Sequence, residues 1–266
     1  MTEPVLHLYD LGPEVTAFST TRHGGVGTGN YASFNINYYC GDREEDIVAN
    51  RKALCQLLGI DAGCLVYPHQ THGDAVAIID RQWMAECPQV LSAELGPKGC
   101  LEGIDAVMTN LKGVCIGVST ADCIPILLYD GAHHACCAVH AGWRGTVKRI
   151  VQKAVKAMAS TYGSCPQQLR AVIGPGISLE SFEVGDEVYE QFAQAGFDMA
   201  RMARKYEKWH IDLWVCNKQQ LMEAGVPETG IHVAGICTYI HHDDFFSARR
   251  LGINSGRIFS GIMLER

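Results

Sequence analysis

Three short segments of this 266-residue chain carry side chains that can bind a metal ion. They are PHQTHGDAV (68–76), STADCIP (119–125) and AVHAGWRGT (138–146). Each segment places one such group, His72, Cys123 or His140, near glycine, proline or another small residue, and loops of this kind commonly carry function. Two imidazoles and one thiolate suit zinc or another borderline metal, and three protein ligands leave a fourth position for water or substrate.

These residue types leave other arrangements open. His69 precedes His72 by three residues and is an equally good ligand by type, and a free cysteine is often a buried structural residue. Cys123 could instead be a nucleophile activated by His140, as in a cysteine hydrolase or amidase. A non-enzymatic alternative is a metal-binding interaction module, whose closed four-ligand site would recruit His69. Spacing alone does not choose between these hypotheses.

Arg144 is the main candidate for binding an anion. The motif GWRGT places it in a loop entering a predicted helix, where N–H groups and the helix dipole favour phosphate or a carboxylate. Arg22 lies in the glycine-rich segment 19–31, which is not a P-loop because GxxxxGK[ST] is absent. Asp105 could supply an acid–base or hydrogen-bonding group, although a solvated carboxylate or helix cap is the simpler interpretation.

The elements that would position these groups mix helices and strands. Apolar spacing predicts helices over 45–59, which ends at a glycine, and over 147–158, 185–196 and 211–225. Short runs rich in Val and Ile predict strands at 64–67, 74–80, 106–110, 113–119, 124–130, 133–142, 171–174, 231–236 and 257–264. The runs between 106 and 142 are predicted to be neighbours in one buried sheet.

The stretch 81–103 contains several Gly and Pro residues and predicts an irregular connection. No linker or internal repeat divides the chain, so we expect a single α/β domain over residues 1–266, with a mixed sheet covered by helices.

The composition excludes several classes of protein. With 47% hydrophobic residues, 19% charged residues and a net charge of −7, the chain can bury a core and is a poor match for nucleic acid. It has no apolar run long enough for a membrane span and no signal-peptide pattern at its start, which predicts a cytoplasmic protein. The twelve cysteines form no CxxC pair, so we expect free thiols in a reducing compartment.

Several motifs of the chain are similar, in order, to those of a known family. They are STTRHGGV, HQTHGDAV, IDAVMTN, STADCIPILLYD, AVHAGWRGT, IGPGISLESFEVGDEV, CTY, FFSARR and GRIFSGIML. On these motifs the chain resembles the laccase-domain family, once described as polyphenol oxidases and now as purine nucleoside phosphorylases. The similarity runs from about residue 18 to the C-terminus, so it covers nearly the whole chain.

The resemblance implies a metal site made of His72, Cys123 and His140, and therefore favours His72 over His69. It implies Zn²⁺ or Cu²⁺ as the metal and a three-layer α/β/α fold grouped with cysteine hydrolases. It also implies phosphorolysis of adenosine, inosine and S-methyl-5′-thioadenosine to the base and a (methylthio)ribose 1-phosphate, with adenosine deaminase as a further activity.

For that chemistry we expect Arg144 and Arg22 to bind phosphate and Asp105 to contact substrate or phosphate. The protein would act as a monomer or homodimer. Copper-dependent polyphenol oxidation is a further alternative, but eleven histidines without an HxH pair argue against a multicopper centre.

Overall fold

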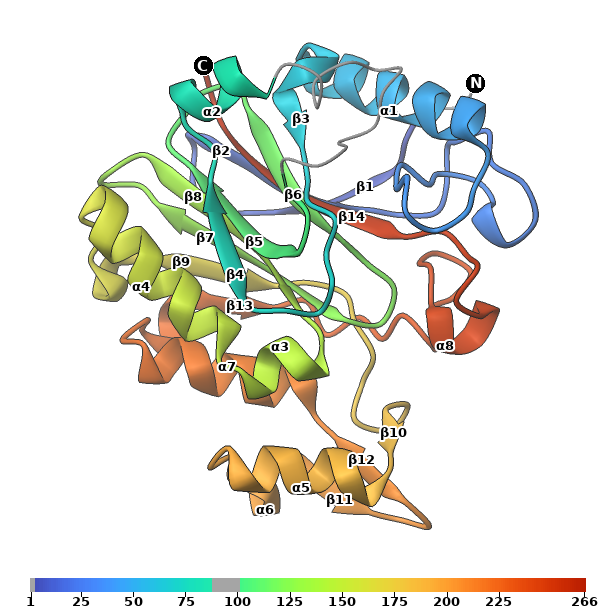
Figure 1. The fold of residues 1–266 in the computed structure, drawn as a ribbon, viewed down its shortest axis with the longest axis vertical. Helices are drawn as coiled ribbons and strands as arrows, with labels where there is room; N and C mark the ends of the chain where they lie inside the picture. Colours follow the sequence, from blue (N-terminus) through green and yellow to red (C-terminus); the bar gives the residue numbers. More distant parts are fainter. Residues whose placement is uncertain (1–2, 88–100) are drawn as a thin grey trace.

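The computed structural model of the chain describes residues 3–87 and 101–266, and its centre is formed by two mixed sheets (Figure 1). The five-stranded sheet has the order β1 (Leu6–Tyr9), β2 (Val15–Thr20), β14 (Ile258–Leu264), β6 (Cys115–Thr120) and β3 (Leu65–Val66). The six-stranded sheet has the order β13 (Ile231–Val233), β9 (Arg170–Ile173), β7 (Ile124–Asp130), β8 (Ala135–Ala141), β5 (Ile104–Thr109) and β4 (Ala75–Ile78). In these two sheets, as far as the structure describes them, β3–β6, β4–β5 and β9–β13 are parallel pairs and the other neighbours are antiparallel.

The two sheets pack face to face, and helices cover their outer faces. The core between them joins Ile116 and Ile262 of the five-stranded sheet to Val107 and Leu127 of the six-stranded sheet. Helices α4 (Ile150–Tyr162) and α7 (Leu213–Glu223) cover the outer face of the six-stranded sheet, whereas α1 (Glu44–Leu58) covers that of the five-stranded sheet. The order of layers is therefore helix, sheet, sheet, helix.

This arrangement corrects the expected three-layer α/β/α sandwich with a single mixed sheet. The run 113–119 does form a strand, but β6 lies in the five-stranded sheet, while β5, β7 and β8 lie in the six-stranded sheet. Every residue of β6 is buried, so its apolar run carries no alternation that could have shown which sheet it joins. The coarser prediction of a mixed α/β single domain is confirmed.

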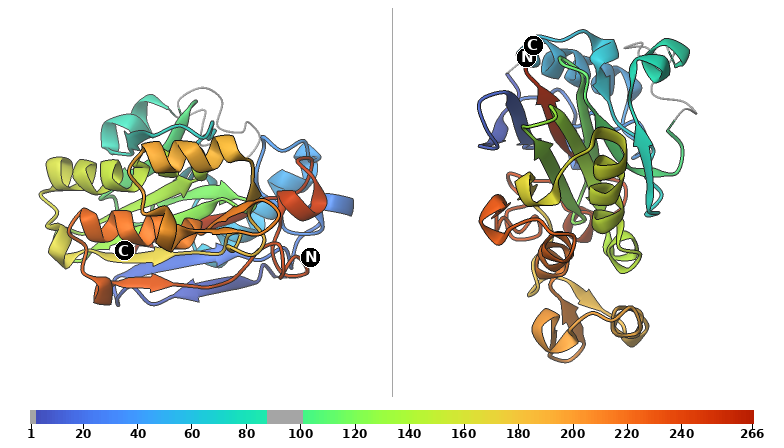
Figure 2. Two further views of the ribbon diagram at one scale, coloured as in Figure 1. Left: turned by 90° about the horizontal axis from the view of Figure 1, so that it is seen from below. Right: turned by 90° about the vertical axis from the view of Figure 1, so that its left-hand side faces the viewer.

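Smaller elements complete the fold. The other α-helices in the described part of the chain are α2 (Arg81–Glu86), α3 (Trp143–Val147), α5 (Asp186–Gln194), α6 (Met199–Met202) and α8 (Ala248–Leu251). Short 3₁₀ helices lie at Gly29–Tyr31, Ala62–Cys64, Pro166–Gln168 and Glu228–Gly230. A third sheet, in the order β10 (Glu183–Val184), β12 (Trp209–Ile211) and β11 (Ala203–Lys205), extends with α5 and α6 from one end of the molecule (Figure 2).

The predicted helices are all present, with boundaries that differ by a few residues. Helix α1 ends where expected, because Gly59 adopts a left-handed φ of 65° that closes the last turn. Helix α2 lies within the stretch predicted to be irregular, and residues 88–100 of that stretch lie outside the described residues. Among the described residues, no helix has the length and apolar character needed to cross a bilayer.

Asp130 shows how a buried carboxylate stabilises a chain reversal, here the connection from β7 to β8. Its Oδ1 accepts hydrogen bonds from the backbone of Ala132 and His133, and its Oδ2 lies 2.9 Å from His133 Nδ1. Burial alone would raise the pKa of this carboxyl group, but the Ser164 hydroxyl, the His133 ring and the two N–H groups favour the carboxylate and lower it.

We therefore expect Asp130→Asn to change how stability depends on pH. Because the folded pKa is depressed, the carboxylate stabilises the fold above its unfolded pKa of about 4 and loses this effect as the pH falls through the folded pKa. Urea unfolding should show the variant destabilised by about 1–3 kcal/mol at pH 7, with the gap to wild type narrowing below about pH 4. Asp243→Asn, at a side chain that is 93% exposed, is the control. A gap that stays constant down to pH 3 would contradict this role for Asp130.

Candidate metal centre

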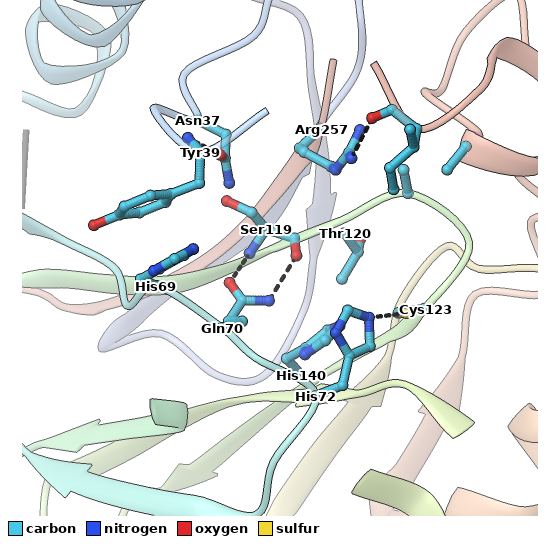
Figure 3. Close-up of a pocket in the computed structure, with 13 residues that line it drawn as sticks. Asn37, Tyr39, His69, Gln70, His72, Ser119, Thr120, Cys123, His140 and Arg257 are labelled. Atoms are coloured by element: carbon cyan, nitrogen blue, oxygen red, sulfur yellow. Dashed lines mark hydrogen bonds between the residues drawn. The ribbon is translucent and has the colours of Figure 1, made fainter. Parts of the chain in front are cut away.

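The structure brings His72, Cys123 and His140 together at one end of the paired sheets. His72 lies in the loop between β3 and β4, Cys123 in the connection from β6 to β7, and His140 near the end of β8. Their ligand atoms all lie within 4.8 Å of one another, and the Cys123 Sγ is 3.8 Å from the His72 Nε2 (Figure 3). Three segments far apart in sequence thus converge on one site.

The backbone is left-handed at one of these residues, His72, and immediately before another, Cys123. His72 has a φ of 61° and Asp122, next to Cys123, has a φ of 86°, both in the left-handed region that non-glycine residues seldom adopt. The Asp122 carboxylate accepts hydrogen bonds from the Thr238 hydroxyl and from the backbone N–H of Arg249, both at 2.7 Å. These hydrogen bonds stabilise the unfavourable backbone conformation of the turn, and such conformations are common at functional sites.

The glycine of the HAGW motif has a spatial explanation. A Cβ atom at Gly142 would lie 2.9 Å from His72 Cδ2 and 3.1 Å from Cys123 Sγ, closer than ordinary van der Waals contact. Any other residue at position 142 would therefore push the two ligands apart.

Asp105, on β5, anchors the ligands from behind. Its side chain is fully buried, and its Oδ1 lies 2.7 Å from His140 Nδ1 and accepts the His72 N–H at 3.0 Å. Its Oδ2 accepts the N–H groups of Gly73 at 2.7 Å and Thr71 at 3.3 Å. The sequence led us to expect a contact to substrate or phosphate, but the structure places Asp105 among these four partners and not in the pocket lining.

Electrostatics favour a thiolate at Cys123. Burial by itself raises the pKa of the thiol, but the charge of His140 and hydrogen bonds from His140 and His72 lower it to about 6. For His140, burial lowers the pKa, whereas the Cys123 charge and the hydrogen bond to Asp105 raise it to about 9. The result is a coupled pair, a thiolate beside an imidazolium.

The donor set fits a divalent metal ion. The hydrogen bond from His140 Nδ1 to Asp105 leaves Nε2 for the metal, the carboxylate–histidine arrangement common at zinc sites. Tetrahedral zinc with ordinary bond lengths separates a sulfur from a nitrogen ligand by about 3.6 Å, close to the 3.8 Å between Cys123 Sγ and His72 Nε2. Among the described residues, this is the one group of three or more His, Cys, Asp or Glu residues placed to hold an ion.

The three ligands open into a pocket of about 270 Å³. Its other lining residues are Asn37, Tyr39, His69, Gln70, Ser119, Thr120, Ala121, Ala248, Ile253 and Arg257. His69 stacks on Tyr39 at 3.8 Å between ring centroids, and its Nδ1 lies 2.7 Å from the Glu102 carboxylate. Gln70 bonds through its amide to both the N–H and the carbonyl of Ser119, at 2.8 and 2.7 Å, which fixes the wall beside the ligands (Figure 3).

Neither predicted phosphate-binding arginine belongs to the described lining of this pocket. Arg144 is exposed at the start of α3, with its guanidinium 4.3 Å from the centre of the Trp143 ring. Arg22 donates to the carbonyls of Ala32 and His242 and lies over the Phe246 ring. The structure therefore does not bring these two side chains together with the metal ligands.

Arg257, Tyr39 and Gln70 are pocket residues that the sequence analysis did not single out. Gln70 sits within the HQTHG motif and Arg257 within GRIFSGIML, so the motifs contained a signal for both. Tyr39 has no such signal, because its place in the pocket depends on the long loop between β2 and α1.

Comparison with known proteins identifies the relatives of the chain. The sequence pattern of the family described as "Multi-copper polyphenol oxidoreductase laccase" matches residues 16–265. A protein of Bacteroides thetaiotaomicron named "Purine nucleoside phosphorylase" is 47% identical over 255 residues, which are 95% of this chain and 92% of the relative. A protein of an unknown prokaryotic organism named "Adenosine deaminase RL5" is 43% identical over 251 residues, 93% of each chain.

Solved structures show the same fold. The Bacillus licheniformis hypothetical protein YfiH superposes with a TM-score of 0.88 at 30% identity, covering 94% of this chain and 93% of its own. YlmD from Geobacillus stearothermophilus gives a TM-score of 0.88 at 27% identity, covering 97% and 94%. The fold is thus shared over nearly the full length of each chain.

The role of Asp105 as an anchor can be tested through metal affinity. We expect Asp105→Asn to weaken zinc binding about 10- to 100-fold, because the carboxylate that orients His140 is lost while the side-chain volume is kept. Zinc titration against a competing chelator measures this directly. Glu102→Gln, which neutralises the carboxylate bound to His69, should change zinc affinity little. Equal affinities of Asp105→Asn and wild type would refute the anchoring role.

Proposed function

Because the chain belongs to the multi-copper polyphenol oxidoreductase laccase family, whose relatives include named purine nucleoside phosphorylases and an adenosine deaminase, we propose a metal-dependent purine nucleoside enzyme. Its reaction would be phosphorolysis of adenosine, inosine and S-methyl-5′-thioadenosine to the base and a (methylthio)ribose 1-phosphate. Deamination of adenosine would be a second activity. The observation that carries the proposal is a three-ligand His–Cys–His site that faces a pocket.

The open fourth position favours catalysis over a structural metal. A structural zinc site usually has four protein ligands, and His69 was the residue available to complete one. Its Nδ1 is engaged by Glu102 and its ring is stacked on Tyr39, and it is not part of the three-residue metal group. These contacts argue against the closed interaction module.

Each residue of the centre has a distinct task in this proposal. A zinc or copper ion held by His72, Cys123 and His140 would supply Lewis acidity and lower the pKa of a bound water. Asp105 keeps the proton of His140 on Nδ1, so that the Nε2 lone pair faces the site. The stacked Tyr39 and His69 rings offer the pocket a flat wall suited to a purine base.

A cysteine hydrolase is the second candidate, and a specific observation favours it. Cys123, His140 and Asp105 form a nucleophile–base–carboxylate series, and the pKa of the thiol is lowered to about 6. Polyphenol oxidation by a multicopper cluster has less support, because the described residues hold one metal-ligand group and not several.

We also propose a cytoplasmic location. The eleven cysteines that the structure describes are all free thiols, as expected in a reducing compartment.

The decisive assay follows base release from inosine, adenosine or methylthioadenosine by chromatography, with and without inorganic phosphate. We expect release that depends on phosphate, and we expect Cys123→Ala to abolish it and to lower the zinc content measured by elemental analysis. Ser160→Ala, on the exposed side of α4, is the control for a small side-chain loss. A metal-free Cys123→Ala protein with full activity would rule out the proposal.

Alkylation separates the two candidate functions. A metal-bound Cys123 should be protected from iodoacetamide until a chelator is added, and activity should fall with the chelator alone. Rapid alkylation of Cys123 in the protein as purified, together with amide hydrolysis that survives the chelator, would instead support the cysteine hydrolase.

A further inference from the structure

Arg257 is the one lysine or arginine among the described residues that line the metal pocket. It ends the loop between α8 and β14, and Figure 3 shows its side chain across the pocket from the three ligands. We propose that Arg257 binds the phosphate co-substrate, in place of the Arg144 and Arg22 side chains expected from the sequence. This inference rests on the proposed phosphorolysis and names the phosphate subsite of that reaction.

The charge of Arg257 has no counter-ion in the described part of the chain. None of the ion pairs there involves this residue, whereas Arg43 and Arg149, for example, each have a carboxylate partner. The described lining of the pocket also contains no Asp or Glu side chain. An unpaired guanidinium in a cavity without carboxylates creates a positive potential that attracts an anion.

The geometry of the guanidinium leaves one edge for a ligand. Its Nη1 donates to the carbonyls of Ser255 at 2.6 Å and Gly256 at 3.0 Å, and its Nη2 donates to the carbonyl of Ile253 at 2.8 Å. A guanidinium has five N–H donors, and within the described residues no acceptor is found for the Nε–H. Arg257 therefore keeps the Nε–H and one Nη2–H for a ligand, and the Nε–Nη2 edge of a guanidinium is a fork that matches two oxygens of a phosphate.

The surrounding backbone holds this fork in a fixed position. The three carbonyl contacts tie the guanidinium to its own loop, and the N–H of Arg257 donates to Asn35 Oδ1 at 3.1 Å. Asn35 is fully buried, so the loop is fastened to the protein interior. A guanidinium fixed in this way loses little conformational entropy when it binds an anion.

The position suits the chemistry of phosphorolysis. A phosphate oxygen forms a bond to C1′ of the ribose as the C1′–N9 bond breaks, its electron pair passes to the purine, and the purine takes up a proton. Arg257 would orient the phosphate and stay paired with it in the ribose 1-phosphate product. The metal site would then act on the bound nucleoside, and Arg257 on the phosphate that attacks it.

The test measures two Michaelis constants for inosine phosphorolysis by the metal-loaded protein. We expect Arg257→Gln to raise the KM for inorganic phosphate about 10- to 100-fold, with the KM for inosine within about 2-fold of wild type. Arg257→Lys, which keeps the charge but loses the fork, should raise the KM for phosphate by a smaller factor. Arg250→Gln removes an exposed arginine of α8 that bonds to Tyr239 and should change neither constant.

Other outcomes overturn the assignment. An unchanged KM for phosphate in Arg257→Gln, or in Arg257→Lys if the glutamine variant does not fold, excludes Arg257 as the phosphate ligand. An equal rise of both Michaelis constants would mean that the side chain only shapes the loop. If the wild-type protein releases no base, the proposed phosphorolysis is wrong, but the phosphate subsite can still be tested. Titration calorimetry with inorganic phosphate then tests whether Arg257 binds the anion. Binding to wild type but not to Arg257→Gln supports the subsite, and no binding to wild type overturns it.

Discussion

The geometry of the candidate metal centre depends on one buried carboxylate. Asp105 is fully buried on β5. Its two oxygens form hydrogen bonds with the His140 ring and with three consecutive backbone N–H groups of the loop that carries His72. Burying a charge without partners is costly, so the loop and the ring must stay in place to satisfy it. In the antiparallel register of β5 and β8, Ala106 faces Val139. This pairing brings the adjacent residues Asp105 and His140 within hydrogen-bond distance. Two of the three ligands are thus positioned by a single side chain.

The third ligand depends on the pairing of the two sheets. Strand β6 ends at Thr120 in the five-stranded sheet and β7 begins at Ile124 in the six-stranded sheet, so the chain crosses between the sheets within three residues. Within this short crossing Asp122 has a left-handed backbone, which the two hydrogen bonds to its carboxylate stabilise. Cys123 follows at once, and therefore lies where both sheets meet. The single mixed sheet of the expected three-layer α/β/α sandwich would not create this crossing.

Local sequence patterns predicted many of the helices and strands and the types of ligand, because these features depend on residues close together in the sequence. The apolar spacing of 45–59 and its terminal glycine define α1, and the short apolar runs define β5 to β9. Partner choice was not predictable, because a fully buried run such as β6 looks the same in either sheet. The pattern also could not separate His69 from His72, since the difference lies in contacts with Glu102 and Asp105 from distant positions. Arg257 was missed for the same reason, because its place in the pocket and its lack of a carboxylate partner among the described residues depend on tertiary contacts.

The same three side chains, Cys123, His140 and Asp105, fit both a metal centre and a nucleophilic triad, and the metal itself separates the two functions. Metal binding requires a thiolate and a neutral imidazole, so an ion entering the site displaces the proton that otherwise stays on His140, whose pKa is raised to about 9. Once that proton is gone, His140 donates its lone pair to the metal and can no longer act as the acid or base of a thiol mechanism. His72 has no part in a nucleophilic triad, yet Asp105 holds its strained backbone in place, with its Nε2 3.8 Å from the thiol. The structure keeps His72 beside the thiol in a costly conformation, and a metal centre would use this additional side chain whereas a cysteine nucleophile would not.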